Sequence, residues 1–315
     1  MSRIITDLSE ALAALRAHNV LAIPTETVYG LAADATNVTA VRSVYEIKKR
    51  PFNHPLIMHV APEWDLSQWV SHIPSYVSEL IAHFCPGPLT LVLPRRPDAV
   101  LDMVTGGHDT LAVRVPNHPL SLALLRAFGA PLVAPSANPF GKMSPTTPEH
   151  VLENFPQETF LILDGGRCTG GIESTIVDAT ETSVCRILRA GLLDSLAITQ
   201  VIGPVLQESA SLVPAPGCLE QHYQPNKPLY CFEDIRSLRD FAQQQEVAVL
   251  SFHASIGLAP YFYYQFSQDP VLVAHDLYYE LHKADHSSAT CIAVELPPNT
   301  PIWQGIRERL IKASQ

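Results

Sequence analysis

Helix-like and strand-like segments alternate along the first 200 residues, and this alternation constrains the fold more than any other feature. Residues 7–19 and 37–49 space their apolar side chains as amphipathic helices do, with Asp7 and Asn37 in N-cap positions. Short apolar runs bounded by proline or glycine indicate strands. The predicted strands are residues 20–24, 55–60, 89–94, 111–116, 130–135, 159–163, 174–178 and 184–188, and further helices fit residues 74–84 and 118–128. The pattern predicts an α/β sheet with helices packed on it.

The composition and the hydrophobic pattern change over residues 207–228, which are rich in Pro, Ser and Gln and show no hydrophobic period. This stretch is typical of a linker or an ordered loop. After it, "LYCFE", "EVAVLS", "PVLVAHD" and "TCIAVELP" are predicted strands, and helices fit residues 234–244, 275–284 and 302–313. We therefore expect three parts: a first α/β domain (1–206), a linker (207–228) and a smaller α/β domain (229–315).

Composition narrows the class of protein. Apolar residues make up 47% of the chain and charged residues 17%, which suits a globular protein, and the formal net charge is -10. The six cysteines are scattered without a CxxC pair, so the sequence predicts reduced thiols rather than a zinc site or a disulfide framework. The N-terminus lacks the apolar core of a signal peptide, and no stretch is long enough for a membrane span. A cytoplasmic location and no membrane partner are expected.

Familiar phosphate and hydrolase motifs are missing from the sequence. There is no GxxxxGK[ST], no GxGxxG after a strand, no HExxH and no GxSxG. If the protein binds a nucleotide, its side chains must make most of the contacts.

A cluster of positive charge ends the second predicted helix. Lys48, Lys49 and Arg50 precede a proline and a predicted buried strand, and His54 and His59 flank that strand. Cations at a helix C-terminus also complement the helix dipole, typically by about 0.3–1 kcal/mol, which is the plainer explanation. However, unpaired cations beside a core are costly, and the cluster therefore indicates an anion site.

Three further segments place hydroxyl, amide and glycine groups beside predicted strands. They are "PTETVYGLAADA" with Thr25 and Thr27, "APSANPFGKMSPTTPEH" with Ser136, Asn138 and Ser144, and "LDGGRCTGGIESTIVD" with Glu173, Ser174 and Thr175. Such groups bind ligands at the ends of strands, but each segment alone also fits an ordinary turn. Arg114 is more specific, because it lies inside an apolar strand with no acid adjacent in sequence, and it should have an anionic partner.

Taken in order, several stretches resemble the YrdC-type domain of the threonylcarbamoyl-AMP synthase family. They are "PTETVYGL", "KKRPFNHPLIMHV", "PGPLTLVLP", "LAVRVPNHP", "APSANPFGKMSPT", "LDGG" with "GIESTIVD", and "ILRAG", and they span residues 20–191. "APGCLEQHYQP" (215–225) is similar to the linker motif of the longer members, although Leu219, Glu220 and Gln221 replace its usual basic or aromatic residues. The resemblance implies a twisted mixed sheet with flanking helices, then a linker and a smaller Rossmann-like α/β domain.

The resemblance also implies a reaction. L-threonine and bicarbonate (or CO2) form a carbamate, which attacks the α-phosphate of ATP to give threonylcarbamoyl-AMP and pyrophosphate. A partner transferase then passes the threonylcarbamoyl group to tRNA. Such an enzyme is a nucleotidyltransferase of tRNA modification. Mg2+ is expected to accompany ATP, with no protein side chain expected to bind the metal.

Roles for individual residues follow from the same resemblance. The catalytic candidates are Lys48 and Arg50. The ATP-binding candidates are Lys48, Arg50, His54, Thr110, Ser136, Asn138, Ser144, Arg189 and Tyr223. The threonine-binding candidates are Thr27, His59, Arg114 and Ser174. The linker, with His222 and Tyr223, is expected to act as a lid; the alternative is a passive tether. No general base stands out, so catalysis would depend on positioning and charge stabilisation.

Two rival functions remain at this point. One is a module that binds double-stranded RNA or tRNA without catalysis, but residues 1–200 carry 14 Lys and Arg against 19 Asp and Glu, which leaves room only for a weak contact with tRNA. The other is a carbamoylation that uses carbamoyl phosphate as donor. Pyrophosphate release that depends on ATP and threonine would separate the synthase from both.

Overall fold

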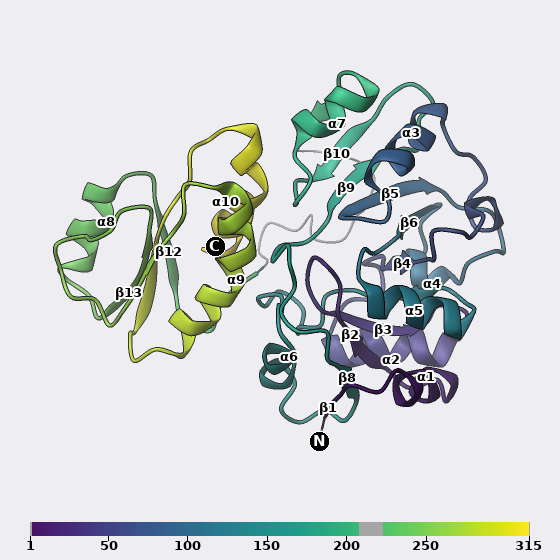
Figure 1. Ribbon diagram of the computed structural model, residues 1–315, viewed down its shortest axis with the longest axis horizontal. Coiled ribbons are helices and arrows are strands. Elements are labelled where there is room, and N and C mark those ends of the chain that lie inside the picture. The colour runs from purple at the N-terminus through teal and green to yellow at the C-terminus, as the bar shows by residue number, and fades with distance from the viewer. Residues whose placement is uncertain (1, 208–222, 315) are drawn as a thin grey trace.

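The computed structural model describes residues 2–207 and 223–314, which form two α/β domains side by side (Figure 1). In the first domain the elements are β1 (Arg3–Ile5), α1 (Leu8–Arg16), β2 (Leu21–Ile23), β3 (Gly30–Asp34), α2 (Val38–Lys48), β4 (Ile57–His59), η1 (Leu66–Gln68), α3 (Ser75–Phe84), β5 (Leu89–Pro94), α4 (Asp102–Thr105), β6 (Thr110–Arg114), α5 (Pro119–Phe128), β7 (Leu132–Val133), α6 (Pro148–Asn154), β8 (Leu161–Leu163), β9 (Thr175–Asp178), β10 (Arg186–Arg189), α7 (Ser195–Ile202) and β11 (Leu206–Gln207). In the second they are β12 (Leu229–Phe232), α8 (Ile235–Ala242), β13 (Val247–Ser251), β14 (Phe262–Gln265), α9 (Pro270–His286), β15 (Cys291–Glu295), η2 (Pro301–Trp303) and α10 (Gln304–Ala313).

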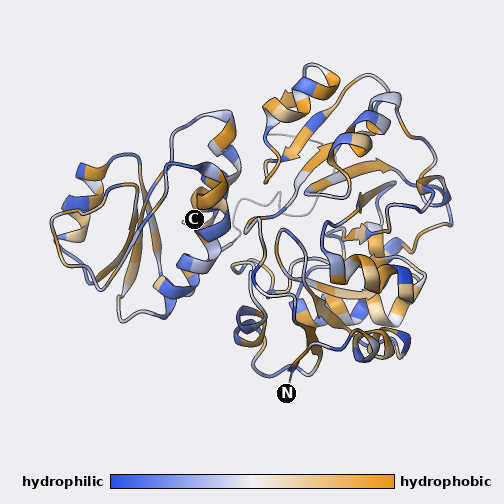
Figure 2. Cartoon of the chain, in the orientation of Figure 1, coloured by the Kyte–Doolittle hydropathy of each residue, from blue (hydrophilic) through white to orange (hydrophobic). Residues whose placement is uncertain are grey.

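The large sheet mixes parallel and antiparallel neighbours in the order β1-β8-β2-β3-β7-β4-β6-β5-β9-β10-β11. The strands β4 and β6 run parallel, whereas β5 and β6 are antiparallel, and β5 pairs parallel with β9. Apolar residues concentrate in these strands and on the inner sides of the helices (Figure 2). The predicted twisted mixed sheet with flanking helices is confirmed.

The small sheet is all parallel, in the order β12-β15-β13-β14. Alternate residues of its strands are buried on opposite faces: Val247 and Val249 pack with α8, whereas Ala248 and Leu250 pack with α9. Parallel sheets are typically covered in this way on both faces. The side of α9 and α10 faces the first domain (Figure 1).

Helix caps explain where the predicted helices begin. Asp7 accepts a hydrogen bond from the backbone N–H of Ser9, and Asn37 accepts one from that of Ala40, as N-cap side chains do. Helix α2 ends because Lys49 adopts a left-handed conformation (φ 53°). That turn directs Arg50 back toward the interior.

One strand prediction is wrong. "PVLVAHD" is the first part of helix α9, where Asp269 caps the helix and Pro270 occupies its first turn. Val271 is 67% exposed, whereas Val273 and Leu277 are buried, which is helical spacing rather than strand alternation. A short apolar run does not distinguish a buried strand from a helix, and β14 is the strand in this part of the sheet.

The two domains share one buried apolar cluster. Val28, Met143 and Ile172 of the first domain pack in the same cluster as Leu277 and Ile306 of the second. The backbones also come close, since a Cβ added to Gly305 would lie 2.6 Å from the carbonyl oxygen of Gly191. Glycine is therefore required where α10 approaches the first domain.

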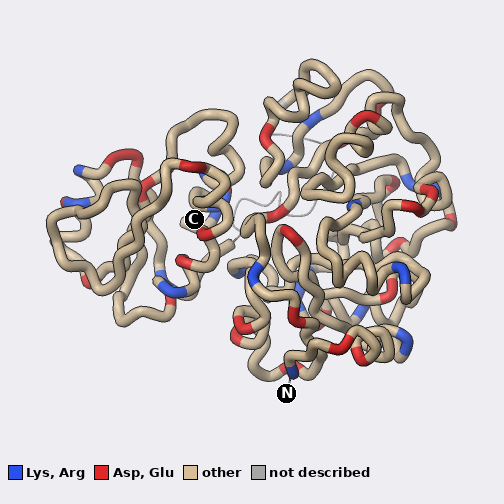
Figure 3. Tube along the Cα trace, in the orientation of Figure 1, with Lys and Arg blue, Asp and Glu red and all other residues tan. Residues whose placement is uncertain are grey.

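Charges are mixed along both domains. Lys and Arg are interspersed with Asp and Glu rather than gathered along one element (Figure 3).

In the described ranges no helix is both long and apolar enough to cross a membrane. The five cysteines found in those ranges are free thiols.

Candidate active site

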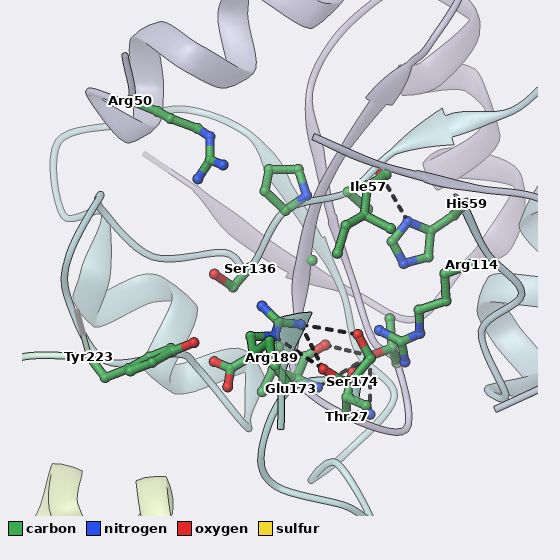
Figure 4. A pocket seen from close by; sticks show the side chains of 15 residues that line it. Thr27, Arg50, Ile57, His59, Arg114, Ser136, Glu173, Ser174, Arg189 and Tyr223 are labelled. Atoms are coloured by element: carbon green, nitrogen blue, oxygen red, sulfur yellow. Dashed lines mark hydrogen bonds between the residues drawn. The ribbon is translucent and has the colours of Figure 1, made fainter. Parts of the chain in front are cut away.

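A pocket opens where the ends of several strands of the large sheet meet the linker. Its empty space, counted together with the open solvent at its mouth, is about 570 Å3. It is lined by Thr25, Thr27, Val28, Gly30, Arg50, Ile57, His59, Arg114, Ala134, Pro135, Ser136, Glu173, Ser174, Arg189 and Tyr223 (Figure 4). Figure 4 shows Arg50 and Tyr223 toward one end, His59 and Arg114 toward the other, and Arg189 between them. Segments far apart in sequence thus converge on one cavity.

The structure brings together eight of the predicted site residues. Those lining the pocket are Thr27, Arg50, His59, Arg114, Ser136, Ser174, Arg189 and Tyr223. The residues that do not line it are Lys48, His54, Thr110, Asn138 and Ser144. The predicted lid residue His222 lies outside the described residues, as do Leu219, Glu220 and Gln221.

Arg50 is buried and held by backbone carbonyls rather than by a carboxylate. Its Nε donates to the carbonyl oxygen of His54 (3.2 Å) and its Nη2 to that of Pro55 (2.8 Å). Burial lowers the pKa of Arg50 to about 10, so the guanidinium remains charged at neutral pH. Since no salt bridge joins Arg50 to an acid in the described chain, its charge is available to an anion in the pocket.

Lys48 lies behind the pocket wall. Its Nζ donates to the carbonyl oxygens of Ser136 and Asn138, and the side chain is fully buried. Burial, followed by the nearby charge of Arg50, lowers the pKa of Lys48 well below its usual value. Lys48 therefore fixes the loop that presents Ser136 to the cavity.

Three of the four other predicted residues outside the lining, Thr110, Asn138 and His54, contact neighbouring strands and loops. Thr110 begins β6, opposite Pro94 of the neighbouring strand. Asn138 donates to the carbonyl oxygen of Lys142 (2.8 Å), and His54 packs edge-on against Phe140. These contacts shape the loops around the pocket.

Arg114 has an internal partner that sequence reasoning missed. Its Nη2 lies 2.6 Å from Oε1 of Glu26, and both side chains are buried. The other carboxylate oxygen of Glu26 accepts the backbone N–H of Asn117 (2.9 Å). Burial, followed by the charge of Arg114, lowers the pKa of the adjacent His59 to about 3, so His59 is a neutral imidazole at pH 7.

Among the residues that the structure describes, Glu173 is the one carboxylate that lines the pocket, and the second domain holds it. Arg309 of α10 donates from Nε to Oε2 (2.9 Å), and the Tyr278 hydroxyl of α9 lies 3.2 Å from both oxygens. Ser144 donates to Oε1. Burial alone would raise the pKa of Glu173, but Arg309 and then Arg189 lower it to about 2.

Arg189 and Tyr223 complete the wall. Arg189 donates from Nε (3.1 Å) and Nη2 (2.9 Å) to the backbone oxygen of Ser174, which ties β10 to the start of β9. The ring of Tyr223 is buried, with the guanidinium of Arg309 5.3 Å from its centroid. The second domain thus touches the pocket through Glu173 and through Tyr223.

The balance of charge favours an anionic ligand. Of the described residues, three buried guanidinium groups line the pocket, those of Arg50, Arg114 and Arg189, against one carboxylate, that of Glu173. Arg309 already compensates Glu173, and Glu26 compensates Arg114. The charge of Arg50, together with the hydroxyl groups of Ser136 and Ser174, suits phosphate and carboxylate oxygens.

Two family models cover nearly the whole chain. The model described as "Telomere recombination" (Sua5_yciO_yrdC) matches residues 13–191, and that of the threonylcarbamoyl-AMP synthase C-terminal domain matches residues 193–315. A threonylcarbamoyl-AMP synthase of Bacillus subtilis (strain 168) is 38% identical, over 98% of this chain and 92% of that protein. One of Pyrococcus abyssi (strain GE5 / Orsay) is 41% identical, over 70% of this chain and 66% of that protein.

Solved structures agree with these matches. The crystal structure of P. abyssi Sua5 complexed with L-threonine superposes with a TM-score of 0.91 at 32% identity, and the match covers 100% of this chain and 97% of that chain. E. coli YciO superposes with a TM-score of 0.55 at 21% identity, over 63% of this chain and 100% of that one, which is a likeness of fold alone.

Proposed function

Because the chain belongs to the threonylcarbamoyl-AMP synthase family, we propose that its pocket combines L-threonine, bicarbonate or CO2, and ATP into threonylcarbamoyl-AMP and pyrophosphate. The product serves the threonylcarbamoyl modification of tRNA. The observation that best supports this function is the convergence of three buried guanidinium groups on one cavity where the described residues contribute a single, already compensated carboxylate. The substrates carry the carboxylate, carbamate and phosphate charges that such a cavity would bind.

We assign the chemical step to adenylyl transfer, which makes the enzyme a nucleotidyltransferase. The neutral amino group of threonine adds to CO2 and releases one proton to solvent, which gives a carbamate. One carbamate oxygen then bonds to the α-phosphorus, and the bond from that phosphorus to the bridging oxygen breaks. Pyrophosphate leaves with the electron pair of that bond. Glu173, the sole carboxylate among the described lining residues, is compensated by Arg309, and His59 has a pKa of about 3. The lining thus favours positioning and charge stabilisation over a general base.

The end of the pocket near Arg50 is our candidate for the triphosphate. Arg50 carries a charge fixed by two carbonyls, and Ser136 stands on a loop fixed by Lys48. Arg189, between the two ends, would face the α-phosphate region, and Tyr223 would pack against the nucleotide (Figure 4). A preorganised cation of this kind stabilises charge that develops on a transferring phosphoryl group.

The end near His59 and Arg114 is our candidate for the threonine site. The bonds of Arg114 to Glu26 and Gly87 use Nη2 and Nε, which leaves Nη1 for a substrate carboxylate. The hydroxyls of Thr27 and Ser174 lie on the same wall and suit the polar groups of threonine. The P. abyssi relative was crystallised with L-threonine, which agrees with an amino-acid site in this fold.

The lining suits a metal that arrives with ATP rather than one held by the protein. Glu173, the only lining carboxylate in the part of the chain that the structure describes, already accepts hydrogen bonds from Arg309, Tyr278 and Ser144. Mg2+ usually keeps several waters and is held largely by substrate phosphates in such sites. Bound to ATP, it would neutralise triphosphate charge; Arg50 and Ser136 would orient the same phosphates.

The proposed function is tested by pyrophosphate release from purified full-length protein. Release should require threonine, bicarbonate and ATP together, and omission of any one should abolish it. Carbamoyl phosphate should not replace threonine and bicarbonate. Release at the full rate without threonine would contradict the proposal and indicate an ordinary ATP pyrophosphohydrolase.

A further inference from the structure

A second cluster of ligating side chains lies between the domains, away from the pocket. His282 and His286 stand one turn apart on α9, so both project from the same face of that helix. Glu153 reaches them from α6 of the first domain. One ligand atom from each of the three residues lies within 4.8 Å of the others, and Nε2 of His286 is 3.8 Å from Oε2 of Glu153. We propose that these residues bind a divalent transition-metal ion that joins the two domains.

His282 provides the most direct evidence for a ligand. His282 is only 5% exposed, and its Nε2 atom is buried without a hydrogen-bond partner in the described structure. A buried polar atom left unsatisfied costs free energy, and a bound ion would satisfy it. The ring is also held in place, because it stacks on His150 with centroids 3.9 Å apart.

His286 has the tautomer that a metal ligand needs. Its Nδ1 lies 2.8 Å from the backbone oxygen of His282, and a carbonyl oxygen only accepts, so Nδ1 carries the proton. Its Nε2 therefore presents a lone pair on the side of Glu153. A hydrogen bond from the second ring nitrogen to a carbonyl is the usual support of a metal-bound histidine.

The donor set selects the class of metal. Two imidazoles and one carboxylate suit zinc and its neighbours such as cobalt, whereas Mg2+ and Ca2+ prefer oxygen ligands throughout. Ligand bonds of about 2.0–2.2 Å around a tetrahedral ion place the donor atoms roughly 3.4 Å apart, so donor atoms that now lie up to 4.8 Å from one another must approach by as much as roughly 1.4 Å. Glu153 and His286 are exposed and free to make that adjustment. The nearby Asp285 is excluded, because its carboxylate accepts the backbone N–H groups of Asn226 and Lys227.

Positive side chains near the proposed site lower its affinity for a metal ion, but they do not form ion pairs with the three proposed ligands. Arg167 and Lys283 line the same groove, together with Glu149 and Asp164. Arg167 is paired with Asp276 at 2.6 Å and Lys283 with Glu280 at 2.9 Å. The ion would therefore link α6 to α9 without displacing either pair. Its position on the domain boundary implies a structural function and not a part in adenylyl transfer.

Cobalt titration of the untagged, full-length protein tests this proposal. We expect saturable binding of one Co2+ per chain, with visible absorption bands of a nitrogen- and oxygen-ligated ion that added Zn2+ abolishes. Glu153→Gln and His286→Ala should each weaken binding at least tenfold. His83→Ala, which removes an exposed histidine of α3, is the matched control and should bind as the wild type does.

Thermal unfolding gives a second readout. Zn2+ should raise the midpoint of the wild type and the His83→Ala control, because a ligand that binds only the native state stabilises it. The same Zn2+ should leave Glu153→Gln and His286→Ala unshifted. Absence of saturable Co2+ binding, or equal binding by all four proteins, would overturn the proposal.

Discussion

At the residue scale, Arg50 differs from the other basic residues of its cluster. It alone reaches the pocket, Lys48 supports the wall from behind, and the backbone of Lys49 makes the turn between them. The sequence predicts the cluster but not this division, because three adjacent cations look alike until the left-handed turn at Lys49 separates their directions. The roles of Arg50 and Lys48 are therefore separable by mutation.

Arg50→Ala should lower kcat/KM for ATP by about 100-fold or more, because it removes a preorganised cation from a water-poor site. Arg126→Ala is the control, since Arg126 is an exposed arginine of α5 paired with Glu63. Steady-state pyrophosphate release measures both. If Arg50→Ala keeps the activity of the control, the triphosphate does not bind at this end.

Lys48→Met should act first on stability. It leaves the buried carbonyl oxygens of Ser136 and Asn138 without their donor, at a cost of about 1–3 kcal/mol for each unsatisfied group. Denaturant unfolding measures the loss. A stability equal to that of the wild type, combined with abolished activity, would instead assign Lys48 to the chemistry.

Arg114 and Glu26 form a pair that tests the threonine site. Arg114→Ala should weaken threonine binding. It should also destabilise the fold by about 3–5 kcal/mol, because it leaves the buried carboxylate of Glu26 without its cationic partner. Adding Glu26→Gln should recover much of the stability but not the affinity for threonine. Calorimetric titration with threonine follows the affinity; full affinity in the double variant would contradict the assigned role.

At the scale of elements, the sequence predicts most of the helices and strands but not which of them meet. The strand that bears Arg114 was identified, whereas Glu26 is 88 positions away and only the folded sheet brings it close. Glu173 stood in a quoted glycine-rich segment, but its partner Arg309 is 136 positions away on α10. No local pattern carries such information, because both pairs form by packing of distant elements.

Helix α10 contributes to the pocket without lining it. Arg309→Met should leave Glu173 buried and uncompensated, destabilise the chain by about 3–5 kcal/mol, and lower activity. Arg236→Met, at an exposed arginine of α8, is the matched control and should change neither. The double variant Arg309→Met/Glu173→Gln should regain stability. An unchanged activity of Arg309→Met would show that the second domain does not position Glu173.

At the scale of the whole molecule, the domains share buried apolar surface and one buried ion pair. A chain ending at residue 206 would expose Val28, Met143 and Ile172 and would lose both Arg309 and Tyr278 from Glu173. We therefore expect the truncated protein to unfold at lower denaturant concentration than the full chain and to release pyrophosphate more slowly. Equal midpoints and equal rates would mean that the second domain is only tethered.

Acid should destabilise the full chain in two stages. His59 has a folded pKa of about 3, below its usual 6.5, so the unfolded chain binds the proton first and stability falls as pH drops below about 6.5. Glu173 has a folded pKa of about 2, below its usual 4.5, so its contribution to stability is lost between about pH 4.5 and pH 2.

Denaturant unfolding between pH 7 and pH 3 measures how steeply the free energy of unfolding falls with pH. His59→Asn should reduce the fall between pH 6.5 and pH 4.5, and an unchanged slope would contradict the assignment to His59.

The identity of the product tests the central claim most directly. Full-length protein is incubated with L-threonine, ATP and 13C-labelled bicarbonate, and the quenched reaction is analysed by mass spectrometry. We predict an ion of threonylcarbamoyl-AMP that carries one 13C atom, absent without threonine and strongly reduced in Arg50→Ala but not in Arg126→Ala. Formation of AMP and pyrophosphate without any labelled adduct, or an adduct formed equally well by Arg50→Ala, would contradict the account.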